Sequence, residues 1–166
     1  MVLGLSIAAF TIIHVIISLV AIASGLIVLA GMFGSHRFPG WTAFFLAMTI
    51  LTSVTGFLFP IKSFTPALGT GAVSMVLLAF ALLALYRNHL SGTWRGIYVV
   101  MAVAALYVNV FVLIVQAFLK VPALHAMAPN GNESPFVIAQ GVALVVFVIL
   151  GFMAANRFRP VLNLQS

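Results

Sequence analysis

The sequence contains no cysteine and a single acidic residue, Glu133. Because there is no thiol, disulfides, thiolate nucleophiles and iron–sulfur clusters are excluded. One carboxylate cannot build a carboxylate-bound metal centre, and without aspartate no Ser-His-Asp constellation forms. The composition therefore argues against hydrolytic and thiol redox catalysis, and we expect a protein that is not an enzyme.

Charged residues of either sign are scarce, because they make only 5% of the 166 residues. A soluble domain carries about 25% charged residues, so this chain lacks the polar groups to cover a water-facing surface. Hydrophobic residues make 64% of the sequence, which indicates the lipid bilayer as its solvent. The net charge of +6 contains no basic run, so we exclude nucleic acid as a partner and expect contact with lipid head groups.

Five apolar stretches are separated by the charged residues, at about 3–32, 41–59, 66–86, 94–119 and 135–156. Each is close to the roughly 20 residues that a membrane-spanning helix needs. The sequence therefore predicts an all-α fold, with residues 1–166 forming one domain of five transmembrane helices. In a four-span alternative, residues 41–59 are only a re-entrant segment. Ala21-Ile22-Ala23 faintly resembles a signal-peptidase site, but no positive residue precedes it, so we expect the first stretch to be retained.

The arginines predict the orientation of the bundle. Five spans place the two termini on opposite sides, and one side then holds Arg37, Arg87, Arg95, Arg157 and Arg159. The opposite side holds Lys62, Lys120 and Glu133. Under the positive-inside rule the arginine side is cytoplasmic, so the N-terminus lies outside and the C-terminus inside. We expect the protein to be integral to a bacterial inner membrane.

Polar residues within the spans predict where a ligand binds. At 1.5 Å per residue, His14 and Asn109 lie roughly 15 Å from the outer helix ends, near the middle of a ~30 Å core. Thr52 and Ser74 lie roughly 10–12 Å deep, and Gln116 and Gln140 roughly 5–8 Å deep. His14 is the only ionisable side chain well inside a span, and such groups are costly there and point to function. We therefore predict an outward-facing polar pocket lined by His14, Asn109, Thr52, Ser74, Gln116 and Gln140.

A structural explanation of the same residues stands beside this prediction. Small and polar stripes commonly face neighbouring helices, because small residues allow close approach. The hydroxyls of Thr49, Thr52, Ser53 and Thr55 can also return to backbone carbonyls of their own helix. In this reading the ring of His14 bonds to Asn109 or to a threonine and joins two helices.

Three functions fit the predicted pocket. The leading one is binding of a neutral or apolar small ligand, or of a partner helix, and without an intramembrane acid the ligand is uncharged or anionic. The first alternative is a small oligomeric transporter or channel with His14 as its proton-sensitive element. The second is an accessory subunit of a respiratory or haem-containing complex, although His14 has no histidine partner at its depth. His125 and Met127 suit copper(I), but two ligands are too few to specify a metal site.

Overall fold

The computed structural model describes residues 2–60 and 66–160, and this part of the chain is all-helical and contains no strand. Its helices are α1 (Ile7–Phe33), α2 (Pro39–Phe57), α3 (Pro66–Leu82), the π-helical turn η1 (Leu83–Arg87), α4 (Trp94–Lys120), α5 (Pro122–Met127) and α6 (Ser134–Arg157). Five helices are long and apolar enough to cross a membrane, with η1 completing the third. The prediction of five spanning helices is confirmed at this level, since the stretch assigned to a re-entrant segment in the alternative is one continuous helix.

Local sequence explains where the helices begin and end. The helix α1 begins four residues later than predicted, because Leu3 and Gly4 have positive φ angles and Ser6 caps the helix by accepting from the Ala9 N–H. Proline stands in the first turn of α2 and of α6, where its missing N–H costs nothing. Pro122 ends α4 and opens the short helix α5, which the sequence did not predict.

The third helix ends in a wider turn. In η1 the backbone N–H of Asn88 donates to the Leu83 carbonyl five residues earlier, and the Asn88 side-chain amide donates to the same oxygen. The Leu90 N–H then donates to the Ala84 carbonyl. These bonds satisfy carbonyls that a helix end otherwise leaves open.

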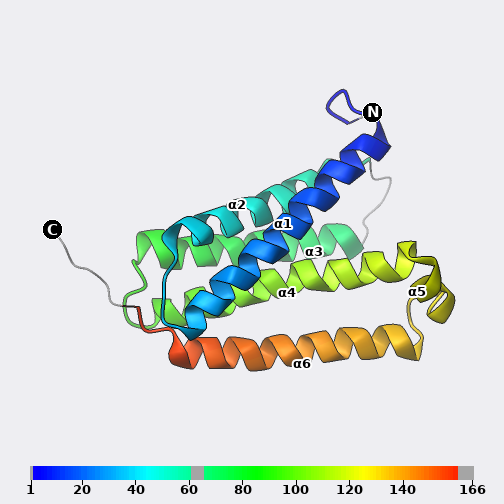
Figure 1. The fold of residues 1–166 in the computed structure, drawn as a ribbon. Coiled ribbons are helices and arrows are strands. Elements are labelled where there is room, and N and C mark those ends of the chain that lie inside the picture. Colours follow the sequence, from blue (N-terminus) through cyan, green and yellow to red (C-terminus); the bar gives the residue numbers. More distant parts are fainter. Residues whose placement is uncertain (1, 61–65, 161–166) are drawn as a thin grey trace.

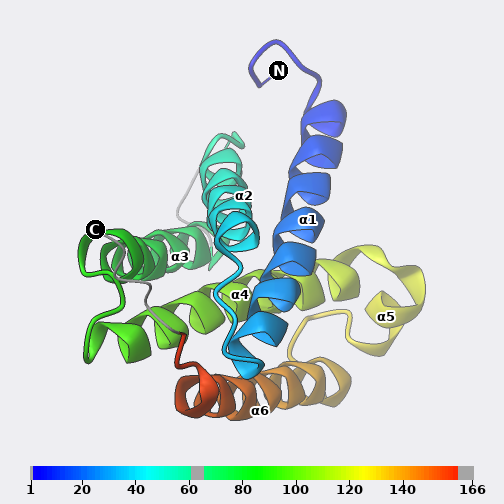
Figure 2. The same ribbon diagram turned by 60° about the vertical axis from the view of Figure 1, so that its left-hand side comes forward.

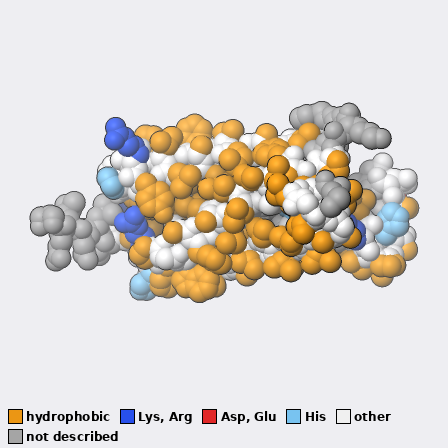
Figure 3. Space-filling model, turned by 90° about the horizontal axis from the view of Figure 1, so that it is seen from above, with side chains coloured by type: hydrophobic (Ala, Val, Ile, Leu, Met, Phe, Trp, Pro, Cys, Tyr) orange, Lys and Arg blue, Asp and Glu red, His pale blue; other side chains and the backbone are white. Residues whose placement is uncertain are grey.

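The ends of the bundle differ in the charges that they carry. The end where α1 finishes, here called the arginine end, holds Arg37, Arg87, Arg95, Arg157 and Arg159. The opposite end, here called the N-terminal end, holds Lys120 and Glu133, while Lys62 lies outside the described residues. Figure 3 shows one face of the molecule, which is covered by hydrophobic side chains, with Lys, Arg and His gathered at the two ends. This is the distribution expected of a bundle surrounded by lipid.

The helix α4 is the centre of the bundle, since it packs against α1, α2, α3 and α6. By contrast α6 lies at the edge, and Ala154 is the only buried residue along it. The first helix runs obliquely across the others, and its N-terminal half rises away from α4 and α6 beside the end of α2 (Figures 1 and 2). The arrangement leaves α1 well packed at the arginine end and sparsely packed at the N-terminal end.

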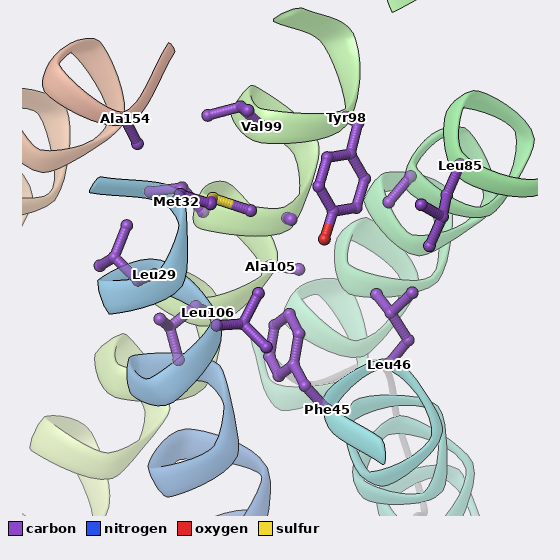
Figure 4. Packing of buried hydrophobic residues seen from close by; sticks show 14 of the residues in the cluster. Leu29, Met32, Phe45, Leu46, Leu85, Tyr98, Val99, Ala105, Leu106 and Ala154 are labelled. Atoms are coloured by element: carbon purple, nitrogen blue, oxygen red, sulfur yellow. The ribbon is translucent and has the colours of Figure 1, made fainter. Parts of the chain in front are cut away.

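The hydrophobic core lies toward the arginine end. Figure 4 shows side chains from α1, α2, η1 and α4 meeting there, among them Met32, Phe45, Leu46, Leu85, Tyr98, Val99 and Leu106. Gly25 allows this approach, because a Cβ at that position would lie 2.6 Å from Leu106 Cδ1 and 2.8 Å from Phe45 Cε2. The close contact provides the dispersion energy on which helix association in lipid depends.

Hydrogen bonds and an aromatic contact also hold the loops at the arginine end. The backbone N–H of Arg159 donates to Ser35 Oγ at 2.7 Å, which ties the chain after α6 to the loop after α1. The hydroxyl of Thr42 donates to the Arg37 carbonyl at 2.9 Å. Tyr98 and Phe158 pack with ring centroids 6.0 Å apart. Together these contacts fix the loops around the core.

Candidate functional site

His14 lies on the face of α1 that meets the end of α2. Its Nδ1 atom is 2.7 Å from Thr55 Oγ1. This hydrogen bond joins two helices through residues that are 41 positions apart in sequence. This is the threonine alternative of the structural explanation, and it identifies α2 rather than α4 as the partner of His14.

The neighbours of Thr55 favour one tautomer of the His14 ring. Thr55 Oγ1 lies 2.6 Å from the Leu51 carbonyl and 3.2 Å from the Thr52 carbonyl, which can accept its single hydroxyl proton. In that arrangement Thr55 Oγ1 accepts at His14 and Nδ1 carries the proton; the opposite tautomer would need Thr55 to donate to Nδ1 instead of to Leu51. In this neutral tautomer Nε2 is an acceptor, and it has no hydrogen bond to any residue that the structure describes.

Two aromatic rings and a glycine hold the imidazole in place. The rings of His14 and Phe59 meet edge to face, with centroids 5.3 Å apart and an interplanar angle of 87°. Phe59 also packs against Phe10, with centroids 5.0 Å apart. A Cβ on Gly56 would lie 3.7 Å from His14 Cε1, an ordinary contact distance, so this position packs against the ring. The ring is therefore positioned by several contacts and not by Thr55 alone.

These partners come from a segment whose function the sequence did not reveal. Thr55-Gly56-Phe57-Leu58-Phe59-Pro60 reads simply as the end of a helix, with aromatics and a breaker. The available signal was the combination of a hydroxyl, a glycine and an aromatic within one turn of that end. Such a combination is suited to hold a side chain of the neighbouring helix.

His14 lies nearer the N-terminal end than the sequence suggested. It stands seven residues into α1, or about 10 Å along the axis, whereas Asn109 stands about 16 Å from the end of α4. Thr55 is only about 3 Å from the end of α2, because that helix is short. The sequence placed His14 and Asn109 at one depth because it could not locate the start of α1.

The other predicted residues each have their own surroundings. Asn109 is 7% exposed and its Nδ2 is 3.4 Å from Thr49 Oγ1, which links α4 to α2. Gln140 donates from Nε2 to the Phe111 carbonyl at 3.1 Å, which links α6 to α4, and its Oε1 is buried without a partner.

The remaining three residues make no hydrogen bond to another helix in the described part of the chain. The Ser74 hydroxyl is buried and has no partner among the described residues. Thr52 donates to the Met48 carbonyl of its own helix at 2.9 Å. Gln116 is half-buried on α4. The prediction that all six residues line one pocket stays a prediction.

The return of hydroxyls to their own helix is confirmed for the cluster on α2. Thr49 donates to the Phe45 carbonyl at 2.9 Å and Ser53 to the Thr49 carbonyl at 3.1 Å, as Thr52 and Thr55 do with theirs. These hydroxyls have used their protons, so they can offer a ligand only their oxygen lone pairs.

Lys120 adds a positive charge at the same end of the bundle. It ends α4 at the N-terminal end and acts electrostatically on His14. Gln116 precedes it by one helical turn, which places both side chains on one face of α4. The open imidazole acceptor therefore lies in the field of an ammonium group.

The residues considered for a metal are exposed. His125 and Met127 lie on α5 with their side chains outside the bundle. In the described ranges no group of three or more His, Asp and Glu residues is placed to hold a metal ion. The pairing of His125 with Met127 as a metal site stays a prediction.

Glu133 organises the loop between α5 and α6. Its carboxylate accepts from the backbone N–H and the side-chain amide of Asn130, at 3.0 and 2.8 Å, and from the Asn132 N–H at 3.1 Å. Desolvation alone would raise the pKa of this carboxyl, but the hydrogen bonds outweigh it and lower the pKa below its ordinary value. The only acid of the chain thus holds a turn at the N-terminal end.

Comparison with known proteins yields no relative: no family model, no curated protein and no solved structure matches the chain. The arguments for its function therefore rest on the residues and contacts given above.

Proposed function

We propose that this multi-pass membrane protein binds a small neutral ligand at its N-terminal end, through Nε2 of His14. The observation that carries the proposal is the difference between the two nitrogens of the imidazole ring. Nδ1 is committed to Thr55, while Nε2 has no partner in the described part of the chain. An intramembrane histidine that leaves one nitrogen unused is a costly arrangement, and an incoming donor would satisfy it.

The surroundings favour one class of ligand. Nε2 needs a donor, which a hydroxyl group supplies. A cation would be disfavoured by the positive charge of Lys120, which acts electrostatically on His14. The half-buried ring of Phe59 offers an apolar surface for the remainder of the molecule, while Phe10 is buried and only supports that ring. An apolar chain with a hydroxyl head group fits these features.

The proposed orientation places this site on the outer side of the membrane. The five arginines at one end of the bundle support a cytoplasmic arginine end under the positive-inside rule. We place the protein in a bacterial inner membrane on the same ground. Proteolysis of the 128–134 loop in sealed, right-side-out vesicles tests the orientation, and protection of this loop would contradict it.

Binding of simple amphiphiles tests the ligand class. We expect octanol to shift the ¹⁵N resonance of His14 Nε2 in the purified protein. Octanoate, which as an anion has no proton to donate, and octylammonium should leave it unchanged. The variant His14→Asn keeps a donor at the position of Nδ1 but has no counterpart of Nε2. It should retain the melting temperature and lose the response, whereas His14→Ala should lose both. If octanol does not shift Nε2 in the unmodified protein, His14 only joins helices.

Haem ligation is a second candidate, which the same ring geometry favours. Histidines that bind metals commonly donate the other ring N–H to a neighbour, as Nδ1 does here to Thr55. A haem subunit would show a Soret band in the visible spectrum of protein purified from haem-replete cells. The absence of that band would remove this candidate and leave the amphiphile site.

A further inference from the structure

A hollow between α4 and α6 is separate from the histidine site. It has a volume of about 260 Å³ and is lined by apolar and aromatic side chains, including Val103, Ala104, Tyr107, Phe147, Gly151 and Phe152. Phe152 is 72% exposed at its edge, so the hollow opens on the surface that faces lipid. It lies at the edge helix of the bundle, where α6 packs on α4 (Figure 1).

Small residues at the seam between the two helices create the space. Ala104 on α4 and Gly151 on α6 have small side chains that leave the bottom of the hollow unfilled. A Cβ on Gly151 would lie 3.4 Å from Val103 Cγ1. Phe147 and Phe152 stand on either side along α6. The result is a shallow site with aromatic walls, a common composition for small-molecule sites.

Tyr107 brings the one polar side chain into this lining. Its ring is held by Phe111 and Phe147, with centroids 6.2 and 5.7 Å away. Its hydroxyl makes no hydrogen bond with any described residue. Tyr107 is the middle residue of α4, about 20 Å from either end of the helix, so this hydroxyl lies at the level of the hydrocarbon core. An unpaired hydroxyl there costs free energy that a bound acceptor would recover.

The depth of Tyr107 in the membrane decides which kind of molecule can form a hydrogen bond with its hydroxyl. The polar groups of a phospholipid lie about 15 Å from the bilayer midplane, so an acyl chain would fill the hollow and leave the hydroxyl unpaired. An uncharged ring with a carbonyl or hydroxyl oxygen can enter the core and stack between aromatic walls. We propose that the hollow binds such a ring-bearing lipophile, of the quinone type, with its oxygen hydrogen-bonded to Tyr107.

Photolabelling with a quinone probe tests this site. An azidobenzoquinone with an alkyl chain, added to the protein in phosphatidylcholine vesicles, should label residues 100–111 and 144–152. Tyr107→Phe keeps the ring and removes the hydrogen bond, and should weaken labelling about fivefold. Tyr86→Phe is the matched control, because Tyr86 is exposed in η1 at the arginine end, and it should label as the unmodified protein does. Gly151→Leu fills the hollow and should abolish labelling.

Competition tests the class of the occupant. Displacement of the probe by unlabelled quinone supports the proposal. Displacement by cholesterol or palmitate as effective as that by quinone would overturn it, because the site would then accept any apolar molecule. Equal labelling of the Tyr107→Phe variant would overturn it as well.

Discussion

The two ends of the bundle are held together by different kinds of interaction. At the arginine end, large apolar side chains from four elements form the core, Gly25 lets α1 approach Leu106 and Phe45, and the loops are tied to each other. At the N-terminal end, α1 contacts α2 through a histidine, a threonine and two phenylalanines, and it rises away from α4 and α6. The arginine end is therefore closely packed, whereas the N-terminal end, where we propose that a ligand binds, depends on a few polar and aromatic contacts.

Overpacking the arginine end should have the largest effect. We expect Gly25→Leu to lower the stability by about 1–3 kcal/mol, since the new side chain would collide with Leu106 and Phe45. The measurement is the melting temperature in a mild detergent. Gly141→Leu is the control, because a Cβ there meets nothing within 4 Å. Equal melting temperatures for the two variants would show that the end is not closely packed.

Removing the bond between His14 and Thr55 should have an intermediate effect. Thr55→Val keeps the shape and leaves the His14 Nδ1–H unpaired, so we expect a loss of about 1 kcal/mol. Thr11→Val is the control, since the Thr11 hydroxyl donates only to Ile7 of its own helix. A double-mutant cycle with His14→Ala measures the coupling. A coupling of zero would mean that aromatic packing alone joins α1 to α2 at this end.

Acid should affect only the N-terminal end, and this is the smallest effect. The lowered pKa of Glu133 means that its carboxylate stabilises the loop above the ordinary pKa, and this stabilisation is lost as the pH falls through the lowered value. The amide resonances of Asn130 and Asn132 should follow that titration in NMR spectra. Glu133→Gln should abolish the titration and leave the amide of Arg159, at the arginine end, unaffected. A titration of these amides that persists in the variant would contradict this assignment.

The pattern of hydrophobicity was enough to predict the helices, because the bilayer imposes their length and composition. It did not predict α5 or η1, which depend on Pro122 and on the bonds of Asn88. His14 was recognised as a candidate because an ionisable group within a span is costly. Its partner was not predicted, since the choice between Thr55 and Asn109 depends on how α1 is tilted and where each helix begins.

The length of α1 has a consequence for the membrane around it. Its 27 residues extend for about 40 Å, which exceeds the ~30 Å hydrocarbon core, whereas the 19 residues of α2 extend for about 28 Å. A helix longer than the core is accommodated by tilting, and α1 is the helix that runs obliquely in this bundle (Figure 1). A thicker bilayer would favour a more upright α1, and the separation of its first half from α4 would then vary with lipid composition. Hydrophobic mismatch would thereby adjust access to the imidazole without any change in the protein sequence.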